Sequence, residues 1–170
     1  MGIISRIAGT GTAGSSGDDG PATNAQLQVP LGVAVTADGG FLIVEFQNNM
    51  VRKVSAAGVI TRVAGTGTAG SSGDDGLATS AQLSRPLGVT ATADGAFLIA
   101  DSANNMVRKV SAAGVITRVA GTGSVGNSGD DGMATSAQLH TPARVAVTAD
   151  GTILISDAKN NEIRMVTPTA

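Results

Sequence analysis

A long internal repeat constrains the fold of this chain more than any other feature of its sequence. The run IAGTG at residues 7–11 returns as VAGTG at 63–67 and at 119–123, an offset of 56 residues from 7 to 63 and again from 63 to 119. A residue present in every copy is most simply part of a shared scaffold, whereas a residue found in one copy marks where a special function would lie. The three copies occupy residues 7–62, 63–118 and 119–170.

Each copy carries four short segments that are typical of β-strands. Large apolar and small side chains alternate at residues 31–35, and residues 41–44 form a short apolar run. Asp38-Gly39 and Asn48-Asn49 supply residues that favour tight turns. The connection to the next copy, 65–86, is rich in Gly, Ser, Thr and Asp, and one helical turn is expected at 78–83 before the chain becomes extended again. In the first copy we expect strands at residues 31–35, 41–44, 50–54 and 59–64.

Four strands per repeat, with a tight turn between each pair, are typical of a β-propeller blade. Residues 3–8 (IISRIA) match residues 59–64 (VITRVA), so the chain begins with a fourth strand, and it ends with a third strand at 161–166. We therefore predict that residues 1–170 form an all-β half-propeller of three four-stranded blades. The N-terminal strand, 3–8, would complete the last blade.

In these repeats the sequence resembles the NHL repeat in its long bacterial form, along nearly the whole chain. The resemblance implies a β-propeller, commonly six-bladed, that mostly binds proteins, nucleic acids or small ligands, with lyases among its relatives. The chain departs from the family where Leu42, Leu98 and Leu154 replace a frequent aromatic residue, which weakens any platform for stacking nucleotide bases. In copy two the resemblance rests on segments 64–67, 72–79, 81–83 and 86–89, on Asp101 with Asn104-Asn105, and on 108–110.

Three blades are too few to close a ring, because propellers have roughly four to eight. They would leave two flat faces exposed, together with an unpaired edge strand that is prone to aggregation. We therefore predict a homodimer with one six-bladed ring, in which strand 3–8 of each chain completes the last blade of the other chain. A nine-bladed trimer is the less favoured alternative.

The composition argues against several kinds of partner. Charged residues make up 14% of the chain and the net charge is −2, so no general field attracts nucleic acid or an anionic membrane. The absence of cysteine excludes disulfides, thiolate nucleophiles and thiolate metal sites. We expect no cofactor, no nucleic-acid partner and no membrane partner. The first residues do not resemble a signal peptide, so the cellular location stays unknown, and a fragment of a longer bacterial protein is one alternative.

Two recurring motifs suggest chemistry but are better explained as turns. Residues 9–14 (GTGTAG) match the dinucleotide pattern G-x-G-x-x-G, yet the helix-breaking run SSGDDG follows where a helix should begin. The pair Asp18-Asp19 recurs in each copy and offers oxygen ligands for Ca²⁺, but its spacing matches no EF-hand loop. Because Asp before Gly is ordinary turn chemistry, we predict no metal site.

No catalytic residues are predicted. His140 is the only histidine, and no serine beside it lies in a nucleophile-elbow context. Paired carboxylates suit hydrolysis, but they occur in every copy and would make six equivalent sites around a ring. The favoured function is a non-catalytic interaction or structural module that assembles with itself and binds an unknown protein. A lyase or hydrolase with a site formed by the dimer is a distant alternative.

Residues that differ between the copies gather just before the first strand of each repeat, where the sequences are QVPLG, SRPLG and HTPAR. Since that strand is innermost in a propeller, we expect Gln28, Arg85, His140 and Arg144 at the mouth of the central channel. A basic mouth would bind a small anionic ligand, which is the alternative function. Neutral variation of exposed loop residues is the competing interpretation. Phe46 is a similar single-copy residue, either an exposed contact or a filler between blades.

Overall fold

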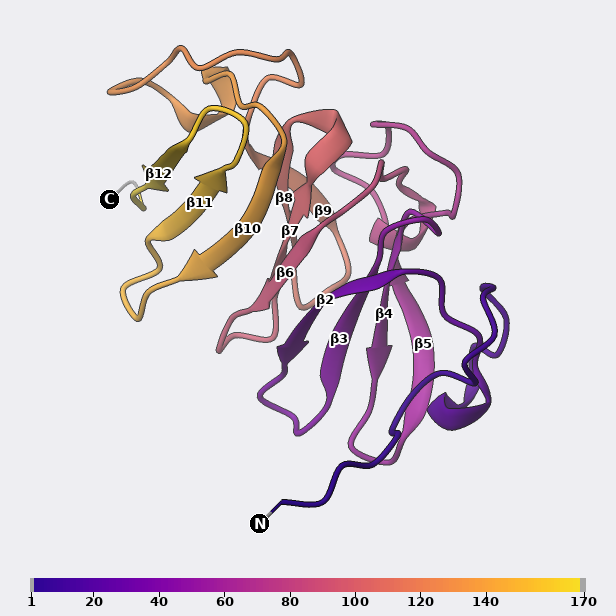
Figure 1. Ribbon diagram of the computed structural model, residues 1–170. Coiled ribbons are helices and arrows are strands. Elements are labelled where there is room, and N and C mark those ends of the chain that lie inside the picture. Colours follow the sequence, from indigo (N-terminus) through magenta and orange to yellow (C-terminus); the bar gives the residue numbers. More distant parts are fainter. Residues whose placement is uncertain (1, 169–170) are drawn as a thin grey trace.

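The computed structural model describes residues 2–168, and most of its regular structure is β-strand. The strands form three antiparallel sheets, one from each repeat, which follow one another as a stack (Figure 1). The prediction of an all-β chain is confirmed. Within the described residues, no helix has the length and apolar character needed to cross a membrane.

Each sheet is a meander in which neighbours in sequence pair as antiparallel neighbours in space. The first sheet contains β2 (Pro30–Val35), β3 (Phe41–Glu45), β4 (Met50–Val54) and β5 (Val59–Ala64), with the short β1 (Gly20–Pro21) beyond β5. The second sheet contains β6 (Gly88–Ala91), β7 (Phe97–Asp101), β8 (Met106–Val110) and β9 (Ile116–Ala120). The third contains β10 (Pro142–Val147), β11 (Ile153–Asp157) and β12 (Glu162–Val166). Short 3-10 helices lie at η1 (Ala22–Asn24), η2 (Ala78–Ser80), η3 (Ser102–Asn104) and η4 (Ala134–Ser136).

The turns lie where the sequence places residues that tolerate a left-handed backbone. Between β2 and β3, Gly39 has a φ of +82°, and between β3 and β4, Asn49 has a φ of 49°. Glycine and asparagine adopt this region at low cost, so each strand can reverse within a few residues. The expected helical turn before Pro86 is also present, as η2.

The core lies between the sheets. Leu42, Val44 and Val51 of the first sheet pack in one buried cluster with Val89 and Ile99 of the second sheet. The same arrangement recurs between the second and third sheets. Burying each large side chain contributes roughly 1.5–3 kcal/mol, so the stacking of sheet on sheet is the main source of stability. The first strands β2, β6 and β10 contact one another in succession, which makes them the innermost strands of the stack.

The predicted strand at residues 3–8 is not formed in the single chain. These residues have no strand structure, and the third sheet has three strands instead of four. A strand needs a hydrogen-bonded neighbour, and the open edge of β12 lies at the opposite end of the stack from the N-terminus (Figure 1). Completion of this sheet by another chain therefore stays a prediction.

Candidate interaction site

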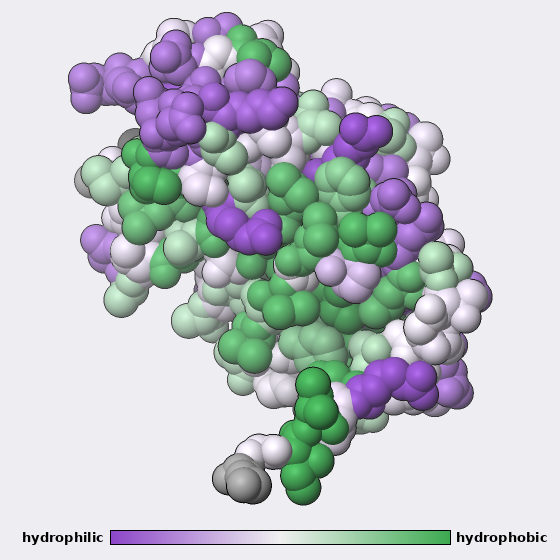
Figure 2. All heavy atoms as spheres, viewed as in Figure 1, coloured by the Kyte–Doolittle hydropathy of each residue, from purple (hydrophilic) through white to green (hydrophobic). Residues whose placement is uncertain are grey.

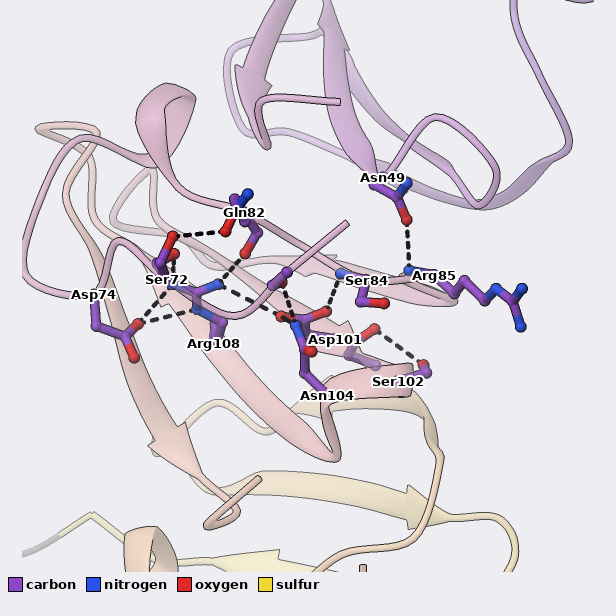
Figure 3. Close-up of polar contacts among 12 residues, drawn as sticks. Asn49, Ser72, Asp74, Gln82, Ser84, Arg85, Asp101, Ser102, Asn104 and Arg108 are labelled. Atoms are coloured by element: carbon purple, nitrogen blue, oxygen red, sulfur yellow. Dashed lines mark hydrogen bonds and ion pairs between the residues drawn. The ribbon is translucent and has the colours of Figure 1, made fainter. Parts of the chain in front are cut away.

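An arginine connects the long loop to the strands in each sheet, and it is fully buried in the first two sheets. In the second sheet, Arg108 is fully buried in β8, and its Nε and Nη2 atoms lie 3.0 and 2.9 Å from Asp74 Oδ1 (Figure 3). Its Nη1 donates to the main-chain oxygen of Gln82 at 2.6 Å and lies 3.5 Å from Asp101 Oδ2. A buried charge must be paired and hydrogen-bonded, and Arg108 meets that requirement through both neighbours. The loop is thereby held against β8, a strand that follows it in the chain.

The same arrangement explains the repeated acidic pairs. Asp18 pairs with Arg52 at 2.9 Å, and Asp130 pairs with Arg164 at 2.7 Å. The second aspartate of each pair has a left-handed backbone, as at Asp75 with a φ of 64°. In these loops the first aspartate of each pair therefore binds an arginine and the second lies in a turn. Among residues 2–168, no three His, Cys, Asp or Glu side chains are grouped so that they could hold a metal ion.

The carboxyl group of Asp101 has an unusual environment. Burial raises the pKa of Asp101 to about 6, although the Asn104 amide, the Ser84 N–H and Arg108 all favour its ionised form. Burial also raises the pKa of Glu45, which occupies the same position in the first sheet. Glu45 accepts a hydrogen bond from the N–H of Gln28, and Asp101 accepts one from the N–H of Ser84. Both bonds fix the main chain just before the innermost strand of the sheet.

Asparagine side chains link successive sheets. Asn49 Oδ1 accepts a hydrogen bond from the N–H of Arg85 at 2.8 Å, as Figure 3 shows, and Asn105 Oδ1 accepts one from Thr141 at 3.0 Å. The acceptors face residues whose φ is positive, 47° at Arg85 and 55° at Thr141, a conformation that costs roughly 1–3 kcal/mol in a non-glycine residue. These bonds therefore hold a strained backbone in place.

The corresponding residue of the first sheet has the same strained backbone but lacks the hydrogen bond to an asparagine. Val29 has a φ of 49° and corresponds to Arg85 and Thr141, but among the described residues its N–H has no hydrogen-bond acceptor. At the other end of the stack, the side chain of Asn161 is exposed and makes no hydrogen bond within residues 2–168. The N–H of Val29 at one end of the stack and the Oδ1 of Asn161 at the other end thus correspond to the donor and the acceptor of the hydrogen bond that forms twice inside the chain.

The outer face of the first sheet is apolar and open. Val33 in β2 is 72% exposed, whereas its counterparts Val89 and Val145 are 9% and 8% exposed because a preceding sheet covers them. Leu31 and Val35 on the same strand are exposed as well. Figure 2 shows apolar side chains gathered over the middle of the molecule, where β2 lies, and on the N-terminal segment. Large contiguous apolar patches of this kind mark interaction sites.

The open end of the third sheet is apolar too, and it has a vacant place. Ile163 and Met165 in β12 are 71% and 63% exposed, whereas Val107, the counterpart of Ile163, is fully buried. A cavity of about 840 Å³ lies between β12 and the loop at 129–134. In the second sheet the corresponding place holds β9, where Ile116 bonds through its main chain to Asp75 and Gly76. The cavity is therefore the place that a fourth strand would fill.

The structure does not gather the predicted channel-mouth residues into a cavity. The guanidinium of Arg85 lies 5.9 Å from the ring centre of Phe46, so two single-copy residues meet across the first junction. Arg144 donates to the main-chain oxygens of Leu87 at 2.7 Å and Ala143 at 3.0 Å.

The other two predicted residues are also engaged locally. Gln28 donates to the Gln47 side chain at 2.8 Å, and His140 is held by its main-chain N–H, which donates to Asp157 Oδ1 at 2.7 Å. Three cavities within the described residues, of about 650, 450 and 840 Å³, are lined by other residues. Anion binding at the mouth stays a prediction.

Comparison with known proteins shows the fold. No family model matches the sequence. The chain is 34% identical over 94 residues to Protein SUPPRESSOR OF QUENCHING 1, chloroplastic, of Arabidopsis thaliana, a match that covers 55% of this chain and 9% of that protein. The chain thus spans less than a tenth of the length of this curated relative.

Solved structures share the arrangement of sheets. A Bacteroides thetaiotaomicron protein of unknown function has a TM-score of 0.66 at 27% identity, over 75% of this chain and 32% of its own. An auxiliary nutrient binding protein from Bacteroides ovatus has a TM-score of 0.65 at 18% identity, over 81% and 37%. A gluconolactonase from Xanthomonas campestris has a TM-score of 0.53 at 14% identity, over 76% and 35%. The chain spans about a third of each.

Two features of the site escaped sequence reasoning. One is the buried arginine, although Asp18 and Arg52, and again Asp74 and Arg108, are 34 positions apart in each copy. The other is the asparagine link between sheets, although the sequence marked Asn49 as a turn residue. Both have a signal in the repeat, because a polar residue kept in every copy of an apolar strand or turn needs a partner.

Proposed function

We propose that this chain is a non-catalytic propeller module, used for binding or as a structural support, whose ring is completed by a second copy. The observation that carries the proposal is the open face of β2. Val33 occupies the position at which Val89 and Val145 are buried by a preceding sheet, so the chain has a prepared surface for one more sheet. Only the third sheet of another copy ends the stack with the matching open face.

A two-fold arrangement satisfies both ends at once. The third sheet of one copy would cover the first sheet of the other, and symmetry supplies the same contact on the opposite side. Three sheets from each copy give six blades, within the range of roughly four to eight that propellers use. Leu154, Ile163 and Met165 supply the apolar surface at this junction, in place of the buried Leu98 and its neighbours inside the chain.

Arg144 sets a limit on how close the two copies come. It occupies the position of Gly32 and Gly88, where an added Cβ atom would lie 3.0 and 2.6 Å from a main-chain oxygen of the next sheet. A Cβ atom is present at Arg144, so the junction between copies has to be wider near the ring axis than the junctions within a copy. The packing there is accordingly less close, which makes this junction the weaker one.

The comparisons extend to the fold, so the choice between binding and catalysis rests on the side chains of this chain. Solved structures with this fold include a protein described as nutrient binding and a protein described as a gluconolactonase, and likeness at 18% and 14% identity extends to the fold alone. The polar side chains repeated in every sheet are occupied in holding loops, as Arg108 and Asp74 are. A lyase or hydrolase formed at the junction is the distant alternative.

A substitution in the open face tests the proposal. Val33→Asp places a charge where the second copy would sit, and we expect the solution mass to fall from two chains to one in sedimentation. Val125→Asp is the matched control, because Val125 is also exposed and its counterpart Ala69 stays exposed at a junction inside the chain. An unchanged dimer in Val33→Asp would overturn the proposed ring.

Binding of a small anion is tested separately. If the ring doubles a basic mouth, sulfate should raise the melting temperature of the wild-type protein but not of the Arg85→Ala/Arg144→Ala variant. Stabilisation of both proteins to the same extent would exclude these residues as the anion site.

A further inference from the structure

The cavity beside β12 lies where β9 lies in the second sheet, next to the third strand and the long loop. We propose that residues 3–8 of a second copy occupy it as the fourth strand of the third sheet, an inference that rests on the proposed ring. On one side of the cavity lies the unpaired edge of β12, and on the other lies the loop at 129–134. Both sides offer main-chain groups to which a strand can bond, as β9 does in the second sheet.

The N-terminal segment has the sequence of the strand that is missing. Residues 3–8 read IISRIA and β5 reads VITRVA, so apolar and polar positions agree throughout. Ile60 of β5 is fully buried between β4 and the loop, whereas its counterpart Ile4 is 98% exposed in the single chain. Ile60 is buried because β5 is part of a sheet, and Ile4 is exposed because residues 3–8 pair with no sheet in the single chain. Burial of such a side chain contributes roughly 1.5–3 kcal/mol.

The segment cannot reach β12 of its own chain. Gly9 and Thr10 are fixed at the first sheet, because their N–H groups donate to the main-chain oxygens of Ala22 and Ala25, each at 2.9 Å. Ala8 precedes this anchor by one residue, whereas the register would place it opposite Ile163 at the far end of the stack. The N-terminal strand therefore belongs to the sheet that would precede the first one.

The repeat supports this direction of exchange. Ala64 ends β5 in the first sheet, and the next residue, Gly65, donates to Ala78 in the loop that packs on the second sheet. A fourth strand thus always leads into the loop of the following sheet. By the same rule, residues 3–8 lead into the first sheet of their own chain from the third sheet of the second copy.

The register of the exchanged strand follows from the first sheet. Lys53 pairs with Thr61 there, which places Met165 opposite Ser5 of the second copy. The same shift along the repeat places Asn161 beside two main-chain groups of the second copy. These are the N–H of Val29 and the carbonyl oxygen of Gly11, the counterparts of the groups bonded by Asn105 in Thr141 and Gly123.

The contacts of the first loop glycine, which recurs in every copy, agree with this register. An added Cβ atom at Gly65 or Gly121 would lie 2.3 Å from the main-chain oxygen of Asn49 or Asn105, in the preceding sheet. Gly9 has the same left-handed backbone, with a φ of +84°, but no residue of a preceding sheet lies near it. The main-chain oxygen of Asn161 from a second copy would take that place.

Disulfide trapping tests the proposal with the 170-residue chain, which has no cysteine of its own. In the Ser5→Cys/Met165→Cys variant, mild oxidation should produce a covalent dimer on non-reducing gels, in high yield. The Ser5→Cys/Lys159→Cys variant is the matched control, because Lys159 is exposed and lies beyond the opposite end of β12. The two single variants report random collision between exposed thiols.

Each outcome separates strand exchange from ring formation. A covalent dimer from the matched pair, well above the controls, supports the exchange. A dimer by solution mass that gives no more cross-link than the controls overturns the exchange and leaves the ring standing. A disulfide formed inside one chain overturns exchange between copies. A monomer by solution mass without any specific cross-link overturns both the ring and the exchange.

Discussion

The Oδ1 atom of Asn105 accepts a hydrogen bond from the main-chain N–H of Thr141 at 3.0 Å, and this bond joins the second sheet to the third. It fixes a residue with a φ of 55° at the entrance to the innermost strand. The same bond joins the first sheet to the second through Asn49. In the account proposed above, Asn161 makes the third such bond to the second copy, so each junction of the ring has one.

This relationship predicts different results for two equivalent asparagines. Asn161→Ala should raise the dimer dissociation constant about 30-fold, because a hydrogen bond contributes about 1 kcal/mol at each of two junctions, about 2 kcal/mol together. Its effect should disappear at concentrations at which the dimer is saturated. Asn105→Ala should instead lower the melting temperature at all concentrations, since that bond lies within the chain. Equal behaviour of the two variants would contradict the account. Sedimentation and thermal unfolding at several concentrations provide the data.

The N-terminal strand predicts a difference between two adjacent isoleucines. Ile4 corresponds to the fully buried Ile60, whereas Ile3 corresponds to Val59, which remains partly exposed in β5. Ile4→Asp should weaken the dimer strongly, on the order of 1,000-fold or more, because removal of a buried isoleucine costs about 2–5 kcal/mol at each of the two junctions. Ile3→Asp should weaken it far less. Since both residues are exposed in the single chain, neither change should unfold the monomer. A dimer indifferent to Ile4→Asp would refute burial of this side chain.

Replacement of Arg144 by glycine is expected to strengthen the dimer. Replacement by glycine restores the residue found at Gly32 and Gly88, so the innermost strands of the two copies can approach as closely as those within a chain. Arg144→Gly should therefore lower the dimer dissociation constant. It also removes hydrogen bonds to Leu87 and Ala143, so monomer stability should be followed by urea unfolding in parallel. A weaker dimer with unchanged monomer stability would mean that Arg144 itself holds the copies together.

Asp101 predicts a dependence of stability on pH. Burial raises its pKa to about 6 from an ordinary 3.8, so the folded chain binds the proton more tightly than the unfolded chain. The free energy of unfolding should therefore fall as the pH rises from about 4 to about 6. Asp101→Asn should flatten this slope, and Glu45 retains part of it because its pKa is also raised. Urea unfolding between pH 4 and 7 measures the slope. The control Asp75→Asn, which alters an exposed loop carboxylate, should leave it unchanged.

Sequence reasoning captured the features that depend on local pattern and on the repeat. The short apolar run at 41–44 and the turn at Asp38-Gly39 were sufficient to predict β3 and its hairpin, because strand pattern and turn chemistry act over a few residues. The burial of Arg52 was missed, since a strand residue with a charge is ordinarily expected to face solvent. The strand at 3–8 was expected from its sequence but is absent from the single chain, where no strand pairs with these residues.

The predicted channel mouth was the hardest feature to derive. The sequence shows which residues occur in one copy only, but the contacts of these residues depend on distances between sheets. Arg85 meets Phe46 across a junction, and Arg144 turns back to Leu87, neither of which follows from position along the strand. The repeat predicts what is common to the sheets, whereas departures from the repeat take their roles from packing between sheets.

The solution mass of the 170-residue chain, measured by light scattering on a sizing column over a wide range of concentration, shows directly whether two chains form the ring. The account predicts a mass of twice the 16.6 kDa of one chain, with dissociation on dilution to a single chain. A mass of one chain at every concentration would contradict the six-bladed ring, and a mass of three chains would favour a nine-bladed ring in its place.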